Sequence, residues 1–459
     1  MDRAKSGTPA SAKDWGGSGK GVELSQHRVE DLIASGVLEI GDGYRAKNSE
    51  LGSIGVPFAR AANINDGFHF KEADRFPVNR LDRVGNKVSR PGDVVFTSKG
   101  TVGRFAFVTE RVERFMYSPQ LCFWRSLKPR VILPKYLYYW MQSDECLHQI
   151  NYLKGQTDMA DYVSLRDQRR MKVSFPDADI QDEISTTLGA LDDKITLLRE
   201  TNSTLEAIAQ ALFKSWFVDF DPVRAKAEGR DPEGVPPEVA DLFPSEFENS
   251  ELGAIPKGWS VGKVSTTSNL SKQARNPLND PETEFEHYSL PAFDLGQLPT
   301  MELGGSIKSN KFVVHEDAVL LSKLNPHIPR LWLPSVRNPS AAVSSTEFLV
   351  LRPTKGFPRE WVYLLLGSER VQSGLRQLVT GTSNSHQRVK PDNLMDLVVV
   401  IPPHGIIQAS YGVIAPLLQR ISEGRAQNAA LAQIRDTLLP RLMSGKIPAM
   451  SIRTIQELR

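Results

Sequence analysis

Apolar residues between positions 180 and 217 recur at alternating steps of four and three, which is the spacing of a coiled-coil seam. The seam consists of Ile184, Leu188, Leu191, Ile195, Leu198, Leu205, Leu212 and Trp216, with Asn202 at a seam position between Leu198 and Leu205. No proline interrupts this run, so the pattern predicts one long helix. A lone helix cannot bury such a stripe, and the pattern therefore also predicts a partner helix.

The same seam returns later in the chain, and Asn202 recurs as Asn428, an offset of 226 positions. The residues that match are Ile195, Arg199, Asn202, Leu205, Ile208 and Leu212 with Ile421, Arg425, Asn428, Leu431, Ile434 and Leu438. We expect the two helices to pair antiparallel in an intramolecular coiled coil, with the two asparagines near its middle as register residues. The correspondence continues upstream from Tyr138 and Tyr363 to Pro176 and Pro402. The repeat unit is a globular domain followed by a long helix, used twice.

The globular part of each repeat has short alternating apolar stretches broken by turn residues, which predict β-strands. In the first repeat these strands fill residues 22–127, followed by a helix over 136–153, a polar loop over 154–162 and a strand that ends at Pro176. The second β-rich part starts near Trp259 and is followed by a helix over 361–378, a loop over 380–388 and a strand over 397–402. The predicted fold class is α+β, with two β-rich domains, a pair of long antiparallel helices and a pseudo-two-fold axis.

Two kinds of loop carry side chains suited to nucleic acid. Lysine neutralises a phosphate, arginine donates two hydrogen bonds to guanine, and amides and hydroxyls match base edges. The first kind contains Ser98, Lys99, Thr101 and Arg104 and, in the second repeat, Ser322, Lys323, Asn325 and Arg330, with Ser98-Lys99 aligned to Ser322-Lys323. The second kind contains Lys154, Gln156, Thr157 and Tyr162 and, in the second repeat, Thr382, Ser383, Asn384, His386, Gln387 and Arg388. Alternatively, these loops are ordinary β-turns and helix-to-strand connections with solvated charges.

Composition narrows the function classes without deciding between them. The chain has 459 residues, 40% of them hydrophobic and 24% charged, and a net charge of +2, so any DNA-binding face must be a local concentration of positive charge. No apolar run is long enough to span a bilayer, which predicts a cytoplasmic protein without membrane contact. Cys122 and Cys146 lack CxxC spacing and are expected to be packing thiols. The Gly- and Ser-rich residues 1–21 are expected to form a disordered arm.

Three segments resemble catalytic motifs but lack an essential part. The run from Gly16 to Lys20 has Asp14 where a phosphate loop needs its first glycine, and Asp221-Pro222 is followed by Val223 rather than by the proline and aromatic residue of an amino-methyltransferase. Asp177 and Asp192 lie about 22 Å apart along the predicted helix, too far to share a metal ion. We therefore expect no catalytic residues, no metal and no cofactor.

Two segments of the sequence resemble those of a known protein family. Leu212-Phe-Lys-Ser-Trp-Phe-Val-Asp-Phe-Asp-Pro-Val223 ends the first long helix, and Leu252-Gly-Ala-Ile-Pro-Lys-Gly-Trp259 opens the second β-rich domain. Because of these two segments and the duplicated layout, residues 22–447 resemble the specificity subunit of a type I restriction-modification system. The implied domains are an arm (1–21), the first target recognition domain (22–176), the first long helix (177–221), a linker (222–258), the second target recognition domain (259–402), the second long helix (403–447) and a tail (448–459).

The resemblance implies a non-catalytic subunit that recognises a two-part asymmetric site in double-stranded DNA. Its partners would be two copies of a methyltransferase (modification) subunit and, where present, two restriction or translocase subunits. A duplicated adaptor that holds two protein ligands and does not bind DNA is the alternative, and the near-neutral charge favours it. Trp216, Phe217 and Phe220, at the end of the first helix, either cap the coiled coil or present a surface to a partner.

Overall fold

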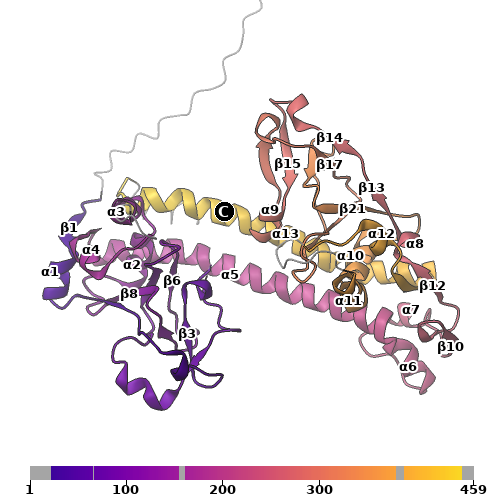
Figure 1. The fold of residues 1–459 in the computed structure, drawn as a ribbon, viewed down its shortest axis with the longest axis horizontal. Helices are drawn as coiled ribbons and strands as arrows, with labels where there is room; N and C mark the ends of the chain where they lie inside the picture. Colours follow the sequence, from indigo (N-terminus) through magenta and orange to yellow (C-terminus); the bar gives the residue numbers. More distant parts are fainter. Residues whose placement is uncertain (1–21, 66, 155–160, 379–386, 447–459) are drawn as a thin grey trace, which may run out of the picture. The chain divides into compact units, whose positions relative to one another are not determined.

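A computed structural model describes residues 22–65, 67–154, 161–378 and 387–446 (Figure 1). The chain forms two compact units. The first unit contains residues 1–193 and 431–459, and the second contains residues 194–430. The first unit is thus assembled from the two ends of the chain, and the second from its middle.

The first unit contains an antiparallel four-stranded sheet in the order β2 (Leu38–Asp42), β8 (Leu121–Ser126), β5 (Val94–Thr97) and β6 (Phe105–Phe107). A second sheet has the order β4 (Arg75–Phe76), β3 (Val56–Ala59) and β7 (Met116–Tyr117), and β1 (Ser25–Arg28) pairs with β9 (Lys172–Phe175). The helices of its β-rich domain are α1 (Val29–Ala34), α2 (Pro134–Met141), α3 (Asp144–Lys154) and α4 (Leu165–Arg170). The rings of Trp124 in β8 and Trp140 in α2 stack at 5.9 Å in the core between sheet and helix.

The second unit repeats this plan. Its four-stranded sheet has the order β13 (Ser268–Ser271), β21 (Phe348–Pro353), β18 (Val319–Ser322) and β19 (Leu331–Trp332), and β12 (Ser260–Lys263) pairs with β22 (Val398–Ile401). A five-stranded sheet has the order β14 (Ala274–Arg275), β17 (Lys311–Val313), β20 (Ala342–Ser344), β15 (Glu284–Tyr288) and β16 (Thr300–Leu303). The helices are α8 (Val264–Thr267), α9 (Leu290–Asp294), α10 (Arg359–Gly367), α11 (Glu369–Gln377) and α12 (Pro391–Met395). The predicted duplication and α+β fold class are confirmed.

In each repeat, the predicted helix after the sheet is in fact two helices, and the prediction of one continuous helix is wrong. The break follows Met141 in the first unit and Gly367 in the second. Serine stands at both breaks: the Ser143 hydroxyl donates to the carbonyl of Trp140 at 2.7 Å, and that of Ser368 donates to Leu365 at 2.6 Å. A serine side chain that bonds a nearby carbonyl competes with the helical backbone, which explains the break.

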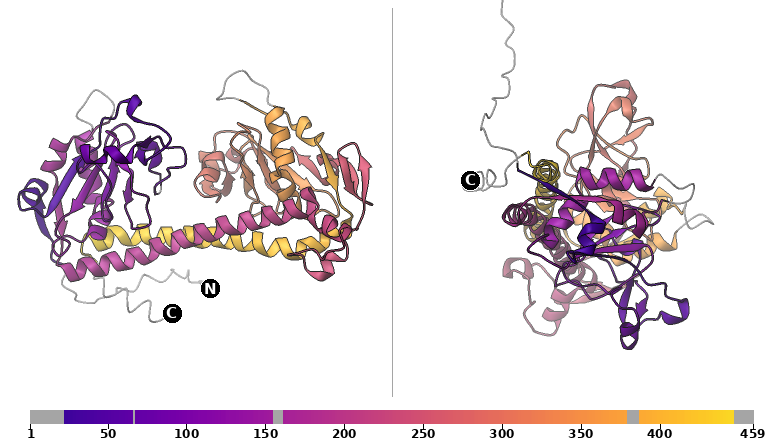
Figure 2. Two further views of the ribbon diagram at one scale, coloured as in Figure 1. Left: turned by 90° about the horizontal axis from the view of Figure 1, so that it is seen from below. Right: turned by 90° about the vertical axis from the view of Figure 1, so that its left-hand side faces the viewer.

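The two long helices are α5 (Ala178–Lys214) and α13 (His404–Met443), and their stretches run antiparallel within each unit (Figure 2). In the first unit, Ile184 and Leu188 of α5 share a buried core with Leu439 and Leu442 of α13. In the second unit, the later part of α5 shares a core with the first part of α13. Its members include Ala209, Phe213, Ile414, Leu418 and Ile421. The predicted seam therefore buries apolar side chains in both units.

A hydrogen-bonded network ties the β-rich domain of the first unit to both helices. Tyr139 of α2 donates to Asp192 Oδ2 at 2.7 Å, and Arg435 of α13 donates to Asp192 Oδ1 at 2.9 Å. In the second unit, Tyr363 of α10 donates to Glu206 Oε1 at 2.6 Å, and Arg425 Nη2 lies 3.4 Å from Glu206 Oε2. Burial, and then the adjacent carboxylate, raises the pKa of both tyrosine hydroxyls, so each stays a neutral donor.

The end of α5 continues as a π-helical turn, Ser215–Asp219, and Phe220 then takes a left-handed conformation with φ of 58°. Trp216, Phe217 and Phe220 are all buried, and the rings of Phe217 and Phe220 contact Trp259. These aromatic residues form core, which excludes the alternative that they present a docking surface.

The predicted linker is ordered and packs into the same core. It contains α6 (Asp221–Ala227), α7 (Pro237–Ala240) and a hairpin of β10 (Phe247–Ser250) and β11 (Gly253–Pro256). Val239, Phe243 and Ile255 from these elements are buried with Trp216 and Trp259.

The two seam asparagines both lie in the second unit, but no hydrogen bond joins their amides in the described part of the chain. The Asn428 Oδ1 atom is buried without a hydrogen-bond partner there. The Asn202 amide lies against Gly424 of α13. A Cβ atom at position 424 would come within 2.4 Å of Asn202 Oδ1, so only glycine fits there without a shift. Asn202 therefore packs against a glycine of α13.

The orphaned amide of Asn428 gives a stability prediction. Replacing Asn428 with leucine removes an unsatisfied buried acceptor, so the free energy of unfolding of the second unit should rise by about 1 kcal/mol. Urea unfolding of the full chain measures this change. Gln427→Leu, at the exposed neighbouring position, is the control and should change stability by no more than about 0.5 kcal/mol. A less stable Asn428→Leu variant would show that the amide supports the helix pair.

Candidate nucleic-acid interface

Residues 98–100 of the first predicted loop lie beside residues 161–163, although about sixty positions separate them in the sequence. The backbone of Gly100 donates to the carbonyl of Asp161 at 3.0 Å, and Val163 donates to Ser98 at 2.9 Å. Lys99 and Tyr162 form an isolated antiparallel β-bridge between these two bonds. The loop after β5 and the segment before α4 are therefore one surface.

The second unit forms the same arrangement. Asn325 donates to the carbonyl of Gln387 at 2.8 Å, Val389 donates to Lys323 at 3.0 Å, and Leu324 bridges Arg388. Sequence comparison alone does not show that these loops meet, because the pairing depends on where the sheet ends. We call the surface around Lys99 and Tyr162 the first loop pair and that around Leu324 and Arg388 the second loop pair.

The hydrogen-bond pattern corrects the predicted alignment of the two loops by one residue. Both Thr97 and Ser322 end their strands and donate to the carbonyl of an arginine, Arg104 and Arg330 respectively. Lys99 therefore corresponds to Leu324, and Lys323 stands in the place of Ser98. The dipeptide Ser-Lys, which occurs in both loops, suggested the wrong alignment. Of the predicted residues, Arg104 and Arg330 correspond as expected.

In the first loop pair, Lys99, Thr101 and Tyr162 are exposed, and Tyr162 exposes 40% of its surface. Arg104 is half-buried and points its guanidinium towards the carbonyl of Ile64 at 3.4 Å. Lys154 lies 3.8 Å from the carboxylate of Asp161. This surface offers an exposed lysine, an aromatic ring and a hydroxyl, with Asp161 next to Tyr162.

The predicted serines do not lie on these surfaces. Ser98 and Ser322 are buried, and their hydroxyls bond the backbone carbonyls of Gln120 and Leu324. They hold the loop backbone, so their predicted contact with a ligand is corrected to a supporting role.

Both predicted arginines of the second unit are engaged by carboxylates. Arg388 makes two hydrogen bonds to Glu347, at 2.8 and 3.2 Å, and Arg330 makes two to Asp294, at 2.7 and 2.9 Å. The Asp294 carboxylate raises the pKa of the Arg330 guanidinium. Sequence reasoning missed both carboxylates.

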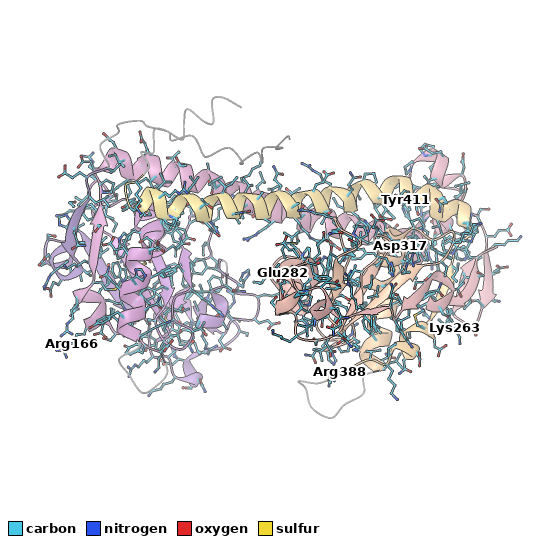
Figure 3. All side chains as sticks on the ribbon, turned by 90° about the horizontal axis from the view of Figure 1, so that it is seen from above. Arg166, Lys263, Glu282, Asp317, Arg388 and Tyr411 are labelled. Carbon is cyan, nitrogen blue, oxygen red and sulfur yellow. The ribbon has the colours of Figure 1, made fainter. Side chains whose placement is uncertain are left out.

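The position of Glu347 has an equivalent in the first repeat, where the residue is a glutamine. Lys323 donates its backbone N–H to the carbonyl of Glu347, and Ser98 donates to Gln120, so Glu347 stands where the first repeat has Gln120. Arg388 lies on the opposite side of the second unit from Tyr411 of α13 (Figure 3). The second loop pair therefore faces away from the part of α13 around Tyr411.

Several predicted residues lie outside the described part of the chain: Gln156, Thr157, Thr382, Ser383, Asn384 and His386. Within the described ranges, no cluster of three or more His, Cys, Asp or Glu side chains is arranged to hold a metal ion. Asp192, which resembled part of a metal site in the sequence, accepts hydrogen bonds from Tyr139 and Arg435. None of the helices in those ranges combines the length and hydrophobicity that crossing a bilayer requires.

The sequence of this chain is similar to those of known proteins. Residues 34–207 match the type I restriction modification DNA specificity domain. The chain is 24% identical over 421 residues to the type I restriction enzyme HindI specificity subunit of Haemophilus influenzae, an alignment that covers 81% of this chain and 90% of the relative. It is also 24% identical over 376 residues to the type I restriction enzyme MjaIX specificity subunit of Methanocaldococcus jannaschii, covering 78% of each.

A solved structure shares the fold. The crystal structure of the S subunit of a type I restriction-modification system from M. genitalium superposes with a TM-score of 0.57 at 11% sequence identity, over 93% of this chain and 97% of that one. The duplicated sheets, the repeated long helices and these matches agree with the resemblance carried by the two sequence segments. Residues 34–207 therefore contain a type I restriction modification DNA specificity domain, which indicates a role in DNA sequence recognition, and the chain is similar over most of its length to type I restriction enzyme specificity subunits.

Proposed function

We propose that this chain recognises a two-part, asymmetric site in double-stranded DNA, with one loop pair reading each part. The observation that carries the proposal is that the same backbone arrangement of two loops occurs once in each unit. A recognition surface that is built twice on one chain suits a target with two separated parts.

The side chains of the two loop pairs support asymmetry of the target. Lys99 and Tyr162 of the first pair correspond to Leu324 and Arg388 of the second. A lysine neutralises phosphate and a tyrosine stacks or donates one hydrogen bond, whereas an arginine can donate two bonds to a guanine edge. The same backbone thus presents different chemistry, so the two half-sites should differ in sequence.

We further propose that the chain is non-catalytic and uses no cofactor. It positions two copies of a methyltransferase subunit and, where present, two restriction subunits. Similarity to type I specificity subunits supports these partners, and the repeated architecture supports two copies, because similar surfaces bind similar proteins. Methylation mapping of DNA from cells that contain the chain and a cognate methyltransferase subunit tests the proposal, since it expects one bipartite motif that disappears when the chain is deleted.

Lys99→Ala tests the first loop pair. Loss of one phosphate contact should weaken DNA binding and lower the salt slope of the logarithm of the binding constant by about one unit. Lys323→Ala tests the second loop pair and should have the same effect. Lys172→Ala, on strand β9, is the matched control and should leave the slope unchanged. Unchanged slopes in both loop variants would contradict these contacts and favour the adaptor function.

Glu347→Gln tests the ion pair in the second loop pair. In the wild-type chain the carboxylate competes with DNA for Arg388. Its neutralisation should strengthen binding to non-target DNA severalfold and reduce discrimination between target and non-target duplexes. Competition binding at fixed salt measures both quantities. Asp317→Asn breaks another arginine pair of the same unit, Arg352 with Asp317, and should change neither quantity. Weaker binding by Glu347→Gln would show that the carboxylate orients Arg388 for DNA.

A fragment of residues 1–230 tests the role of the helix pair. It lacks α13, so Ile184 and Leu188 lose Leu439 and Leu442 as packing partners. At micromolar concentration the fragment should dimerise through the exposed seam and carry two identical β-rich domains. With methyltransferase subunits, it should then modify an inverted repeat of one half-site. Sedimentation and methylation mapping check this outcome, and a monomer that modifies no such site would contradict it.

A further inference from the structure

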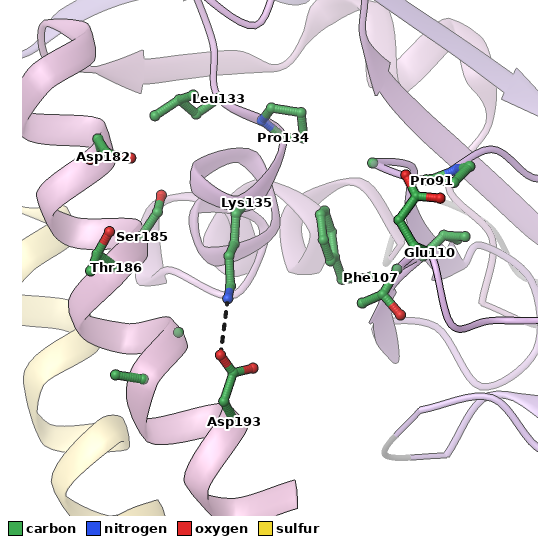
Figure 4. A pocket seen from close by; sticks show the side chains of 15 residues that line it. Pro91, Phe107, Glu110, Leu133, Pro134, Lys135, Asp182, Ser185, Thr186 and Asp193 are labelled. Atoms are coloured by element: carbon green, nitrogen blue, oxygen red, sulfur yellow. Dashed lines mark ion pairs between the residues drawn. The ribbon is translucent and has the colours of Figure 1, made fainter.

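A groove in the first unit lies outside the loop pair. It has a volume of about 730 Å³, is open to solvent, and is lined by residues 182–193 of α5, the start of α2 and the end of β6 (Figure 4). Phe107, Val108, Leu133 and Pro134 supply apolar surface to it. A space of this size holds several side chains of a bound segment.

The rim of the groove is acidic. Glu110, Asp182 and Asp193 line it, with Lys135 as the basic residue among its lining side chains. Lys135 lies 3.9 Å from the Asp193 carboxylate, and Asp193 remains largely exposed. Three carboxylates against one ammonium group favour a basic ligand and repel the phosphates of DNA.

A buried hydroxyl in the wall of the groove lacks a partner. Ser185 is 5% exposed, and its Oγ atom has no hydrogen-bond partner among the described residues. Buried polar groups are nearly always satisfied, so an orphaned hydroxyl at a cavity wall marks a place where a ligand can complete the bonding.

The second unit has a cavity at the equivalent place, but its volume is only about 230 Å³. The repeat offset of 226 relates Ser185 to Tyr411 and Gly189 to Ala415, so bulkier side chains fill the space in the second unit. The same offset relates Asp193 to Gln419, which removes a negative charge from the rim. The duplication therefore produced one open acidic groove and one closed counterpart without the same charge.

We propose that the groove of the first unit binds a basic, partly apolar segment of one methyltransferase subunit. The inference rests on the proposed function and adds where one partner copy makes a contact that the other copy lacks. Acidic side chains pair with the basic residues of the segment, its apolar residues cover Phe107 and Pro134, and a polar group reaches Ser185 Oγ. The two methyltransferase copies therefore bind the chain with unequal affinities.

The test titrates the purified cognate methyltransferase subunit onto the full chain and resolves the two binding steps by calorimetry. Ala190→Trp fills the groove from an exposed position, and the double variant Glu110→Lys, Asp182→Lys reverses its charge. Each should weaken the tighter step at least tenfold and leave the other step unchanged. Gln419→Lys, at the equivalent place in the second unit, is the control and should alter neither step.

The outcomes separate this inference from the proposed function. If the wild-type chain binds no methyltransferase subunit, the proposed function fails. If the wild-type chain binds two copies and both groove variants behave like it, only the inference is overturned. Cross-linking from Ala190→Cys in the assembled complex identifies the occupant. A cross-link to a basic segment of the methyltransferase subunit supports the inference, whereas one to the chain's own residues 1–21 or to the restriction subunit overturns it.

Discussion

Burial of the seam between α5 and α13 is the interaction on which both compact units depend. In the first unit, Leu439 and Leu442 cover Ile184 and Leu188, so a segment from the end of the chain completes a domain formed near its beginning. Without this contact each helix would expose a continuous apolar stripe to water, which costs roughly 25 cal/mol per Å² of apolar area. The long helices are therefore integral to the core of each unit.

Directional hydrogen bonds between the β-rich domains and the long helices supplement this apolar packing. A tyrosine from the β-rich domain, a carboxylate from α5 and an arginine from α13 meet in the first unit as Tyr139, Asp192 and Arg435. Tyr363, Glu206 and Arg425 meet in the second. The repeat offset of 226 does not relate Asp192 to Glu206, so the same chemistry arose at different positions of the repeat. Charge-assisted hydrogen bonds need defined geometry, and each network fixes the orientation of its sheet on the helices in a way that apolar contacts alone cannot.

Local electrostatics account for a DNA-recognition chain whose net charge is only +2. Arg330 and Arg388 are each held by a carboxylate, while Lys99 is exposed. The arginine charges of the second loop pair are thus compensated. Acidic residues gather instead at the groove of the first unit, around Asp182 and Asp193. Composition averages over these surfaces and hides the difference between them.

The duplication, the two long helices and the resemblance to specificity subunits follow from the sequence alone, because the seam repeats with a fixed offset and the segments around Trp216 and Trp259 are specific. It also singled out the loops that meet at Lys99 and Tyr162, since polar loops of both kinds stand out from their apolar surroundings. The correspondence between the two loops required the folded structure, because Lys99 bridges Tyr162 and Leu324 bridges Arg388, which makes Lys99 equivalent to Leu324 and not to Lys323. Burial removed Ser98 and Ser322 from the loop surfaces, and pairing with Glu347 compensated Arg388. These outcomes depend on contacts between residues far apart in the chain, which periodicity and composition do not encode.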